Sequence, residues 1–113
     1  MAAFGKVPPK AEKPAVTMYF VYILQSLSKK RFYIGHSSNV ERRLKEHNAG
    51  KVRSTKGYVP WQLIYEEEHK SKSQAFAREM QIKKYKSGEA FKKLIGEIYF
   101  LNQIVHRYKW RGG

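Results

Sequence analysis

Continuous apolar runs and regularly spaced apolar positions divide most of this chain into strand-like and helix-like segments. The aromatic and β-branched run at 19–24 is typical of a buried strand. A second short strand is expected at 31–35, close enough in sequence to pair with the first as an antiparallel hairpin. A third strand is predicted at 61–65, after a basic loop at 51–60.

Two helices are expected between and after these strands. The first is predicted to have Ser38 as its N-cap, with the glutamate three residues later completing a capping box, and to stop at 48–50. The second is predicted to begin at Ser71 or Ser73 and to run to about Tyr85. This element order predicts an α+β fold in which helices pack against a small three-stranded antiparallel sheet.

The C-terminal pattern leaves three interpretations open. From Glu89 onward the apolar residues follow helical spacing, but beyond Ile98 nearly all sides are apolar. That segment fits a helix docked on the core, a partner surface such as the contact of a homodimer, or a strand. The predicted organisation is a flexible basic arm at 1–17, a folded domain at 18–96 and a C-terminal helical extension or tail at 97–113.

The composition narrows the chemistry. Lys and Arg total 23 against 9 acidic residues, which gives a formal net charge of +14. Such a charge on a small domain favours nucleic acid as a partner, DNA first, with RNA left open. All the acids are Glu and there is no Cys, so Asp-based metal loops, thiolate zinc sites and disulfides are excluded.

No apolar run approaches the roughly 20 residues that span a bilayer, and the N-terminus lacks the apolar stretch of a secretory signal. A cytoplasmic protein with no membrane contact is therefore expected.

The first predicted helix carries polar residues on its apolar side. At about 100° per residue, His47 falls within the stripe formed by Val40 and Leu44, and Arg43 lies on its flank, whereas Arg42 points to solvent. Such an Arg is either an ordinary surface residue whose stem lies along apolar neighbours or a group that faces an anion. The pairing of Arg43 with His47 at i and i+4 favours the anion.

The second predicted helix repeats the pattern with the opposite charge. Glu79 falls inside an apolar arc formed by Ala75, Phe76, Met80 and Ile82, with Lys83 beside it. One interpretation is an i, i+4 ion pair worth about 0.3–0.5 kcal/mol. The other is a single carboxylate directed at a site, where it would ligate a hard divalent cation such as Mg²⁺.

Two tyrosines complete the candidate chemistry. Tyr22 and Tyr33 lie centrally in neighbouring strands, where each could simply fill the core with its hydroxyl hydrogen-bonded. Alternatively, both hydroxyls converge with Arg43, His47 and Glu79 into a group suited to a phosphodiester. Nucleic-acid contacts are expected from exposed cations of the basic loop and the second helix, namely Lys51, Arg53, Lys56, Lys83 and Lys84.

The remaining acidic and imidazole side chains give weaker signals. The run at 66–68 is a weaker carboxylate candidate, interpreted as the solvated end of a strand. His36, His69 and His106 show no metal-ligand spacing and are interpreted as ordinary surface or loop residues.

Taken in order, these segments resemble a known family. Val21-Tyr22-Ile23 followed by Tyr33-Ile34-Gly35 resembles the two-part signature of the GIY-YIG endonuclease superfamily, although the first triplet is degenerate. The segments at 35–50, 60–65 and 75–84 resemble the family's later blocks, so the likeness covers about 19–95. It is nearest to short single-domain bacterial proteins related to the catalytic domain of the excision-repair nuclease.

The resemblance implies roles for the candidate residues. Tyr33, or in some proposals Tyr22, would be the general base or would position water. Arg43 would contact the phosphate, His47 would assist, and Glu79 would ligate one Mg²⁺ or Mn²⁺. An Asn that some members place beyond the metal-binding Glu has no counterpart near Phe91, though Asn102 follows later.

Two functions remain open at this point. The first is a metal-dependent endonuclease that hydrolyses DNA phosphodiester bonds in repair or processing. The second is a nucleic-acid-binding module of the same fold that has lost useful catalysis. Two features favour it: the degenerate first triplet and the lack of a separate DNA-binding domain.

Overall fold

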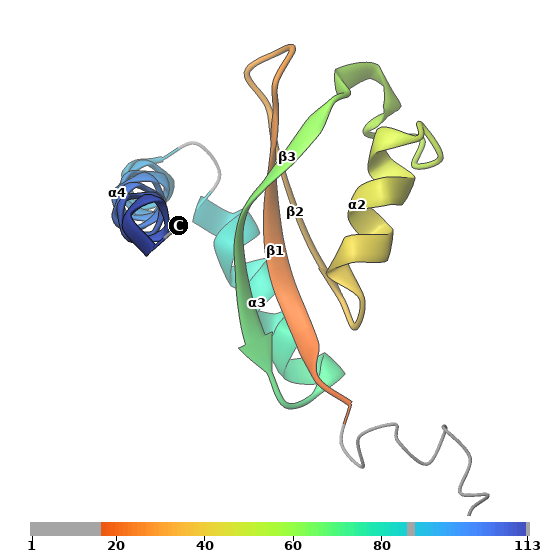
Figure 1. Ribbon diagram of the computed structural model, residues 1–113. Coiled ribbons are helices and arrows are strands. Elements are labelled where there is room, and N and C mark those ends of the chain that lie inside the picture. The colour runs from red at the N-terminus through yellow and green to blue at the C-terminus, as the bar shows by residue number, and fades with distance from the viewer. Residues whose placement is uncertain (1–16, 86–87, 113) are drawn as a thin grey trace, which may run out of the picture.

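The computed structural model describes residues 17–85 and 88–112, and within them it contains a three-stranded antiparallel sheet with helices on both faces (Figure 1). The strand order is β2-β1-β3, so β1 is central and the other two strands are edges. The elements in chain order are β1 (Tyr19–Ser26), β2 (Phe32–Ser37), α2 (Val40–Asn48), the short 3₁₀ helix η2 (Lys56–Tyr58), β3 (Trp61–His69), α3 (Lys72–Tyr85) and α4 (Glu89–Gly112). The predicted α+β class is therefore confirmed. The predicted arm at 1–17 lies almost entirely outside the described residues.

The central strand is apolar throughout because both of its faces are covered. Val21 and Ile23 belong to a cluster on the side of α3 and α4, whereas Tyr22 and Leu24 belong to a second cluster on the side of α2. Successive side chains of a strand point to opposite faces, so one short run supplies both cores.

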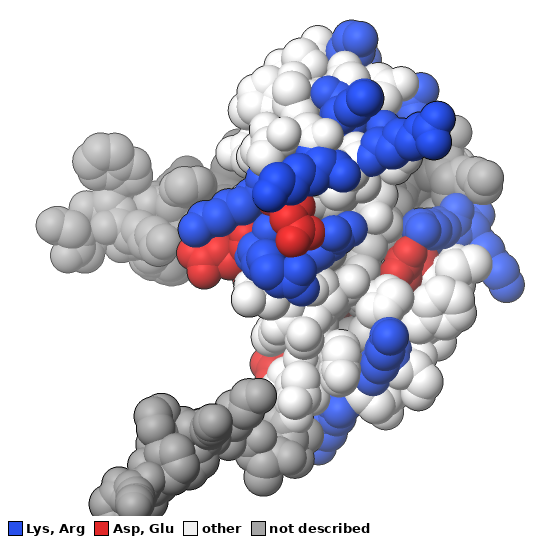
Figure 2. All heavy atoms as spheres, turned by 90° about the vertical axis from the view of Figure 1, so that its right-hand side faces the viewer, with Lys and Arg blue, Asp and Glu red and all other residues white. Residues whose placement is uncertain are grey.

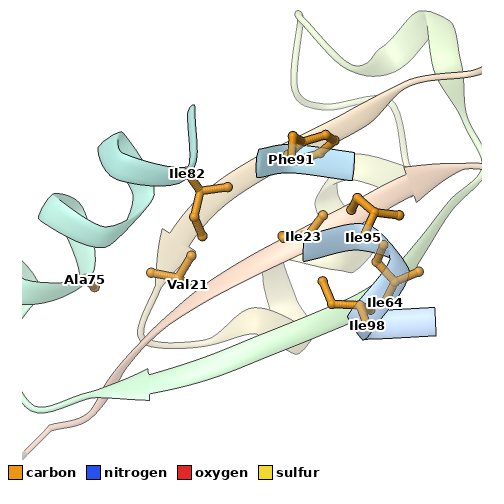
Figure 3. Packing of buried hydrophobic residues seen from close by; sticks show 8 residues of the cluster. All are labelled: Val21, Ile23, Ile64, Ala75, Ile82, Phe91, Ile95 and Ile98. Atoms are coloured by element: carbon orange, nitrogen blue, oxygen red, sulfur yellow. The ribbon is translucent and has the colours of Figure 1, made fainter. Parts of the chain in front are cut away.

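The core on the α3 and α4 side is almost entirely aliphatic. Figure 3 shows residues of the central and third strands, α3 and α4 meeting there, with Phe91 as the one aromatic member. The cluster comprises Val21, Ile23, Ile64, Ala75, Ile82, Phe91, Ile95 and Ile98.

The start of α2 differs from the prediction. The N-cap is Asn39, whose side-chain oxygen accepts a hydrogen bond from the backbone N–H of Arg42 at 3.0 Å, and Ser38 is exposed and does not cap the helix. Ser37 accepts a bond from the Asn39 N–H, which fixes the turn from β2. Asn and Ser are about equally good caps, so composition alone could not choose between neighbours. At α3 the prediction of Ser71 is confirmed, since its hydroxyl accepts from the Gln74 N–H at 3.1 Å.

The third strand is longer than predicted. It continues through the three glutamates to His69, pairing Glu66, Glu67 and Glu68 with β1. Glu66 and Glu68 are exposed while Glu67 is partly buried. An edge strand with one solvated face accepts charged residues, so the acidic run does not end the strand.

The buried side of α3 also differs from the prediction. Phe76 is 51% exposed and Met80 is 40% exposed. The buried residues are Ala75, Glu79 and Ile82, spaced i, i+4, i+7, so the stripe that faces the sheet is narrower and lies beside the expected one. The expectation that Glu79 lies among buried residues is correct, and its buried neighbours are Ala75 and Ile82.

The C-terminal segment is a helix, which excludes the strand among the three interpretations. Up to Ile98 its apolar side packs on the sheet, but Tyr99, Phe100 and Leu101 are 41%, 62% and 54% exposed. None of the helices within the described residues is long and apolar enough to cross a membrane. A homodimer through this helix stays a prediction.

Candidate active site

A chain of hydrogen bonds links the central strand, α2 and the loop after it. The Tyr22 hydroxyl lies 3.2 Å from Nε2 of His47, and Nδ1 of the same ring lies 2.8 Å from Thr55 Oγ1. Because the Thr55 hydroxyl donates to the Val52 carbonyl, it accepts a bond from Nδ1–H. This network assigns an unprotonated Nε2 to His47, which accepts the Tyr22 hydroxyl proton.

Burial keeps this pair neutral. Tyr22 is 1% exposed and His47 is fully buried. Burial raises the pKa of Tyr22 to about 12, with Tyr33 acting in the same direction and Arg43 in the opposite one. Burial also lowers the pKa of His47, and the nearby Arg43 charge adds to this effect. At neutral pH a protonated tyrosine therefore donates to a neutral histidine.

Gly35 makes room for the two tyrosines. A Cβ atom at this position would lie 2.9 Å from the Tyr22 hydroxyl oxygen and 2.9 Å from the Tyr33 ring. The ring centroids of Tyr22 and Tyr33 are 6.1 Å apart, and those of Tyr33 and His47 are 4.6 Å apart. A side chain at the Gly35 position would force these groups apart, so the glycine of the second triplet is needed on steric grounds.

Only part of this cluster reaches the surface. The Arg43 side chain is 29% exposed and bonds to Glu46 at 2.6 Å, so the anion expected beside it is one helical turn away on the same helix. Tyr33 is partly buried. Tyr33 and Arg43 are therefore the members that could touch a bound substrate, whereas Tyr22 and His47 lie beneath them.

Glu79 lies on the other face of the sheet. Its side chain is 9% exposed, and its two oxygens bond to His36 Nδ1 and Lys83 Nζ, each at 2.5 Å. The expected i, i+4 pair with Lys83 is thus present, but the second oxygen of Glu79 has another partner, His36. The interpretation of His36 as an ordinary surface residue is wrong. Strand alternation places His36 with Ile34 on the α3 side, a signal that could have identified it.

The candidate residues are therefore brought together in two groups. Tyr22, Tyr33, Arg43 and His47 meet on the α2 side, while Glu79 meets His36 on the α3 side. Both groups adjoin β2, which carries Tyr33 and His36 on opposite faces and is an edge strand. A ligand lying along this edge would have one group on each side.

Glu79 is also the group to test for metal binding. Among the described side chains, at 17–85 and 88–104, no three His or Glu residues are grouped as a ready-made metal site. Mg²⁺, however, keeps several waters and is often held by one or two carboxylates together with substrate phosphate. A nearly buried carboxylate fits a hydrated cation of this kind, provided that the 44% exposed Lys83 side chain moves off its oxygen.

A second polar cluster fastens α3 to the sheet. Glu67 accepts hydrogen bonds from Tyr65 at 2.5 Å, from His69 at 2.8 Å and from Arg78 at 2.8 Å. The interpretation of the run at 66–68 as solvated is therefore wrong for Glu67, and that of His69 as an ordinary surface or loop residue is wrong. Because Arg78 precedes Glu79 in α3, this cluster fixes the helix that carries the carboxylate.

The expected nucleic-acid contacts fall on two sides of the sheet. Figure 2 shows the side of α2, where Lys and Arg side chains spread towards the end of the sheet that carries the β1–β2 turn and η2. Lys51, Arg53 and Lys56 are exposed in the loop there, whereas Lys83 and Lys84 belong to α3 on the opposite side.

Neither Asn102 nor His106 is part of the described site. Asn102 donates to the Ile64 carbonyl on β3, so it lies at the far edge of the sheet from Gly35. The side chain of His106 lies outside the described residues.

Comparisons with known proteins give a match to one family model and a set of similar proteins. Residues 18–93 match the family model of the GIY-YIG catalytic domain. A "UPF0213 protein" of Haloquadratum walsbyi is 41% identical over 59% of this chain and 75% of its own length. Another of Staphylococcus haemolyticus is 39% identical over 66% of this chain and 90% of its own. The solution NMR structure of a UPF0213 protein from Bacillus halodurans is 30% identical, covers 70% of this chain and 83% of that one, and gives a TM-score of 0.44.

Proposed function

The chain belongs to the GIY-YIG family of nuclease domains, and on this premise we propose that it is a metal-dependent endonuclease that hydrolyses DNA phosphodiester bonds in DNA repair or processing. The observation that carries the proposal is the pair of groups on either side of β2. Tyr33 and Arg43 reach the surface on one side, and the nearly buried carboxylate of Glu79 lies on the other.

The scissile phosphate would lie at the free edge of β2. There the Arg43 guanidinium would stabilise the negative charge that grows on the phosphate oxygens during attack by water. Glu79 would hold one Mg²⁺ or Mn²⁺, which when bound neutralises phosphate charge and lowers the pKa of water. The Arg43–Glu46 contact is exposed enough for the guanidinium to exchange its carboxylate partner for a phosphate.

Of the two tyrosines, we assign the direct role to Tyr33. The Tyr22 hydroxyl already donates to His47, is almost fully buried and has a pKa raised to about 12, so it is a poor proton acceptor at neutral pH. Tyr33 is the less buried residue of the pair and would orient the attacking water or accept its proton. Tyr22 and His47 would act as positioning residues that hold Tyr33 and Arg43 in place.

Single-turnover cleavage of branched, nicked and single-stranded DNA in Mg²⁺ tests this function. Glu79→Gln keeps the size of the side chain but removes the charge that holds a cation, and we expect it to lower the cleavage rate about 100-fold or more. Glu97→Gln, on the exposed surface of α4, is the matched control and is expected to cut like the parent. Equal rates for Glu79→Gln and the parent would overturn the assignment.

The second candidate, a nucleic-acid-binding module without turnover, is favoured by one observation. Both oxygens of Glu79 are already engaged by His36 and Lys83, so a cation would have to share the carboxylate with these partners or displace one of them. Salt-dependent DNA binding measured beside the cleavage assay separates the two candidates. Binding without cleavage in either Mg²⁺ or Mn²⁺ would identify the module.

A further inference from the structure

The turn between β1 and β2 is built as a rigid projection. The hydroxyl of Ser26, which is 5% exposed, accepts hydrogen bonds from the backbone N–H groups of Ser28 at 3.2 Å and Lys29 at 3.0 Å. The same hydroxyl donates to the Tyr58 carbonyl at 2.7 Å, and the Leu27 N–H donates to the Pro60 carbonyl at 2.9 Å. The turn is thereby tied to the segment around η2, and little conformational entropy remains to be lost on binding.

Cations of the turn pack over the same tyrosine. The Lys29 ammonium is 5.3 Å and the Arg31 guanidinium 4.7 Å from the centre of the Tyr58 ring. Lys30 is exposed between them. These contacts orient positive charge at one end of the sheet without neutralising it, because an aromatic ring attracts a cation yet carries no net charge.

A large apolar side chain stands among these charges. Leu27 is 60% exposed, whereas its strand neighbours Leu24 and Ser26 are buried. A single exposed leucine is ordinary on a protein surface. This one differs because it sits on a fixed turn that continues into three consecutive exposed cations, Lys29, Lys30 and Arg31. DNA-binding proteins use this combination, in which cations hold the phosphates and an apolar wedge enters between bases.

We propose that the projection formed by residues 27–31 is a second DNA contact, in which Leu27 packs into an unpaired or mismatched step of a duplex. The inference rests on the proposed function, because it assumes that DNA lies across the α2 side. Leu24 pairs with Tyr33 across the hairpin, and Leu27 lies three residues further along the chain. Leu27 lies just beyond the end of β1, and three residues of extended chain span at most about 10 Å, the length of about three base pairs of duplex. The preferred substrate would be DNA with a distortion within about three base pairs of the cleaved bond.

Binding measured in EDTA tests the inference apart from cleavage. The probes are a fully paired duplex and the same duplex with one mismatch, each carrying 2-aminopurine beside the mismatch position. We expect the parent to bind the mismatched duplex about 10-fold more tightly and to increase the 2-aminopurine fluorescence, as unstacking requires. Leu27→Ala should reduce the preference to about 2-fold or less and abolish the fluorescence change, with an unchanged salt dependence. Leu101→Ala, which truncates an exposed leucine on α4, is the matched control and should behave like the parent.

A charge variant separates the wedge from the cations. Lys30→Gln should weaken binding to both duplexes equally and reduce the slope of log affinity against log salt by about one, which would support separate roles. The inference is overturned if the parent shows no preference or if Leu27→Ala keeps it. A protein that prefers the mismatch in EDTA but never cleaves would support the wedge while contradicting the nuclease. Cleavage without any preference would do the reverse.

Discussion

The two faces of the sheet are built from different kinds of residue. On the side of α3 and α4 the core is aliphatic apart from one phenylalanine, and it joins four elements, the strands β1 and β3 and the helices α3 and α4. On the side of α2 the buried cluster is smaller and consists of Tyr22, Leu24, Val40 and Trp61, with a fully buried imidazole beside it. The first face resembles an ordinary protein interior, and the second contains polar groups that need partners.

This difference predicts that substitutions on the α3 and α4 side mainly affect folding stability, whereas substitutions on the α2 side mainly affect the proposed reaction. Aliphatic burial contributes about 25 cal/mol per Å² and needs no particular geometry at any atom. The buried hydroxyl and imidazole add stability only while each hydrogen bond is made, because an unpaired buried polar group costs about 1–3 kcal/mol. The side that is poorer in aliphatic contacts holds Tyr33 and Arg43 in fixed positions. The aliphatic side contributes Glu79 at its margin.

The largest expected effect concerns Arg43. Arg43→Ala should lower the rate of DNA cleavage by about 100- to 1,000-fold, or about 3–4 kcal/mol in activation free energy, because a charge that stabilises the reacting phosphate is lost. Arg42→Ala is the control, since Arg42 is the adjacent residue and also bonds to Glu46, but its side chain is 56% exposed and points away from the cluster. Single-turnover rates measure both variants, and a similar loss in the two would show that only surface charge matters.

On the opposite face, truncation should affect folding and leave the chemistry intact. Ile23→Ala should lower the free energy of unfolding by about 2–5 kcal/mol, because Ile23 is fully buried among aliphatic neighbours. Urea unfolding at constant pH measures this loss, with Leu101→Ala as the exposed control. The cleavage rate per folded molecule should not change at a temperature where the variant is folded. A selective loss of cleavage would instead show that the two faces are not separable.

A smaller loss is expected from removing one hydroxyl on the α2 side. Tyr22→Phe leaves His47 Nε2 buried without its donor, so the free energy of unfolding should fall by about 1–3 kcal/mol. Tyr99→Phe, at a 41% exposed position, should have no measurable effect in the same unfolding assay. If the two variants were equally stable, the Tyr22–His47 bond would not contribute to the fold.

The smallest effect is a pH dependence that belongs to the α2 side. Burial lowers the pKa of His47 below its usual value of 6.5, so the unfolded chain binds a proton more readily than the folded one. The stability contributed by neutral His47 is complete above pH 6.5 and is lost as the pH falls through the lower pKa of the folded state. Urea unfolding from pH 7.5 to 5 should show this decline in the parent and less of it in His47→Gln. An identical decline in both would assign it to other groups.

Much of this arrangement could be predicted from periodicity alone. The continuous apolar run identifies β1 because a central strand is covered on both faces, and the turn to β2 follows from proximity in sequence. The helical position of His47 indicates a buried imidazole on α2 because i, i+4, i+7 spacing with Val40 and Leu44 leaves it no other direction. These features follow from the local geometry of one strand or one helix, without knowledge of contacts between distant segments.

Other features depended on tertiary contacts. The periodicity of α3 favoured Phe76 and Met80 as core residues, but the sheet covers the side with the small Ala75, so the larger side chains remain exposed. His36 looked ordinary because its partner Glu79 is 43 positions away in sequence. One interpretation of the sequence brought all the candidate residues into one group, whereas strand alternation divides them between two faces at the edge of β2.

The most direct test of this account is a double-mutant cycle on cleavage. The account holds that Arg43 and Glu79 act on one phosphate from opposite sides of the same edge strand. Single-turnover rates of Arg43→Ala, Glu79→Gln and the double variant should then be non-additive, with the double variant scarcely slower than the slower single one. Losses that multiply would show that the two residues act independently, and would contradict a shared phosphate at the edge of β2.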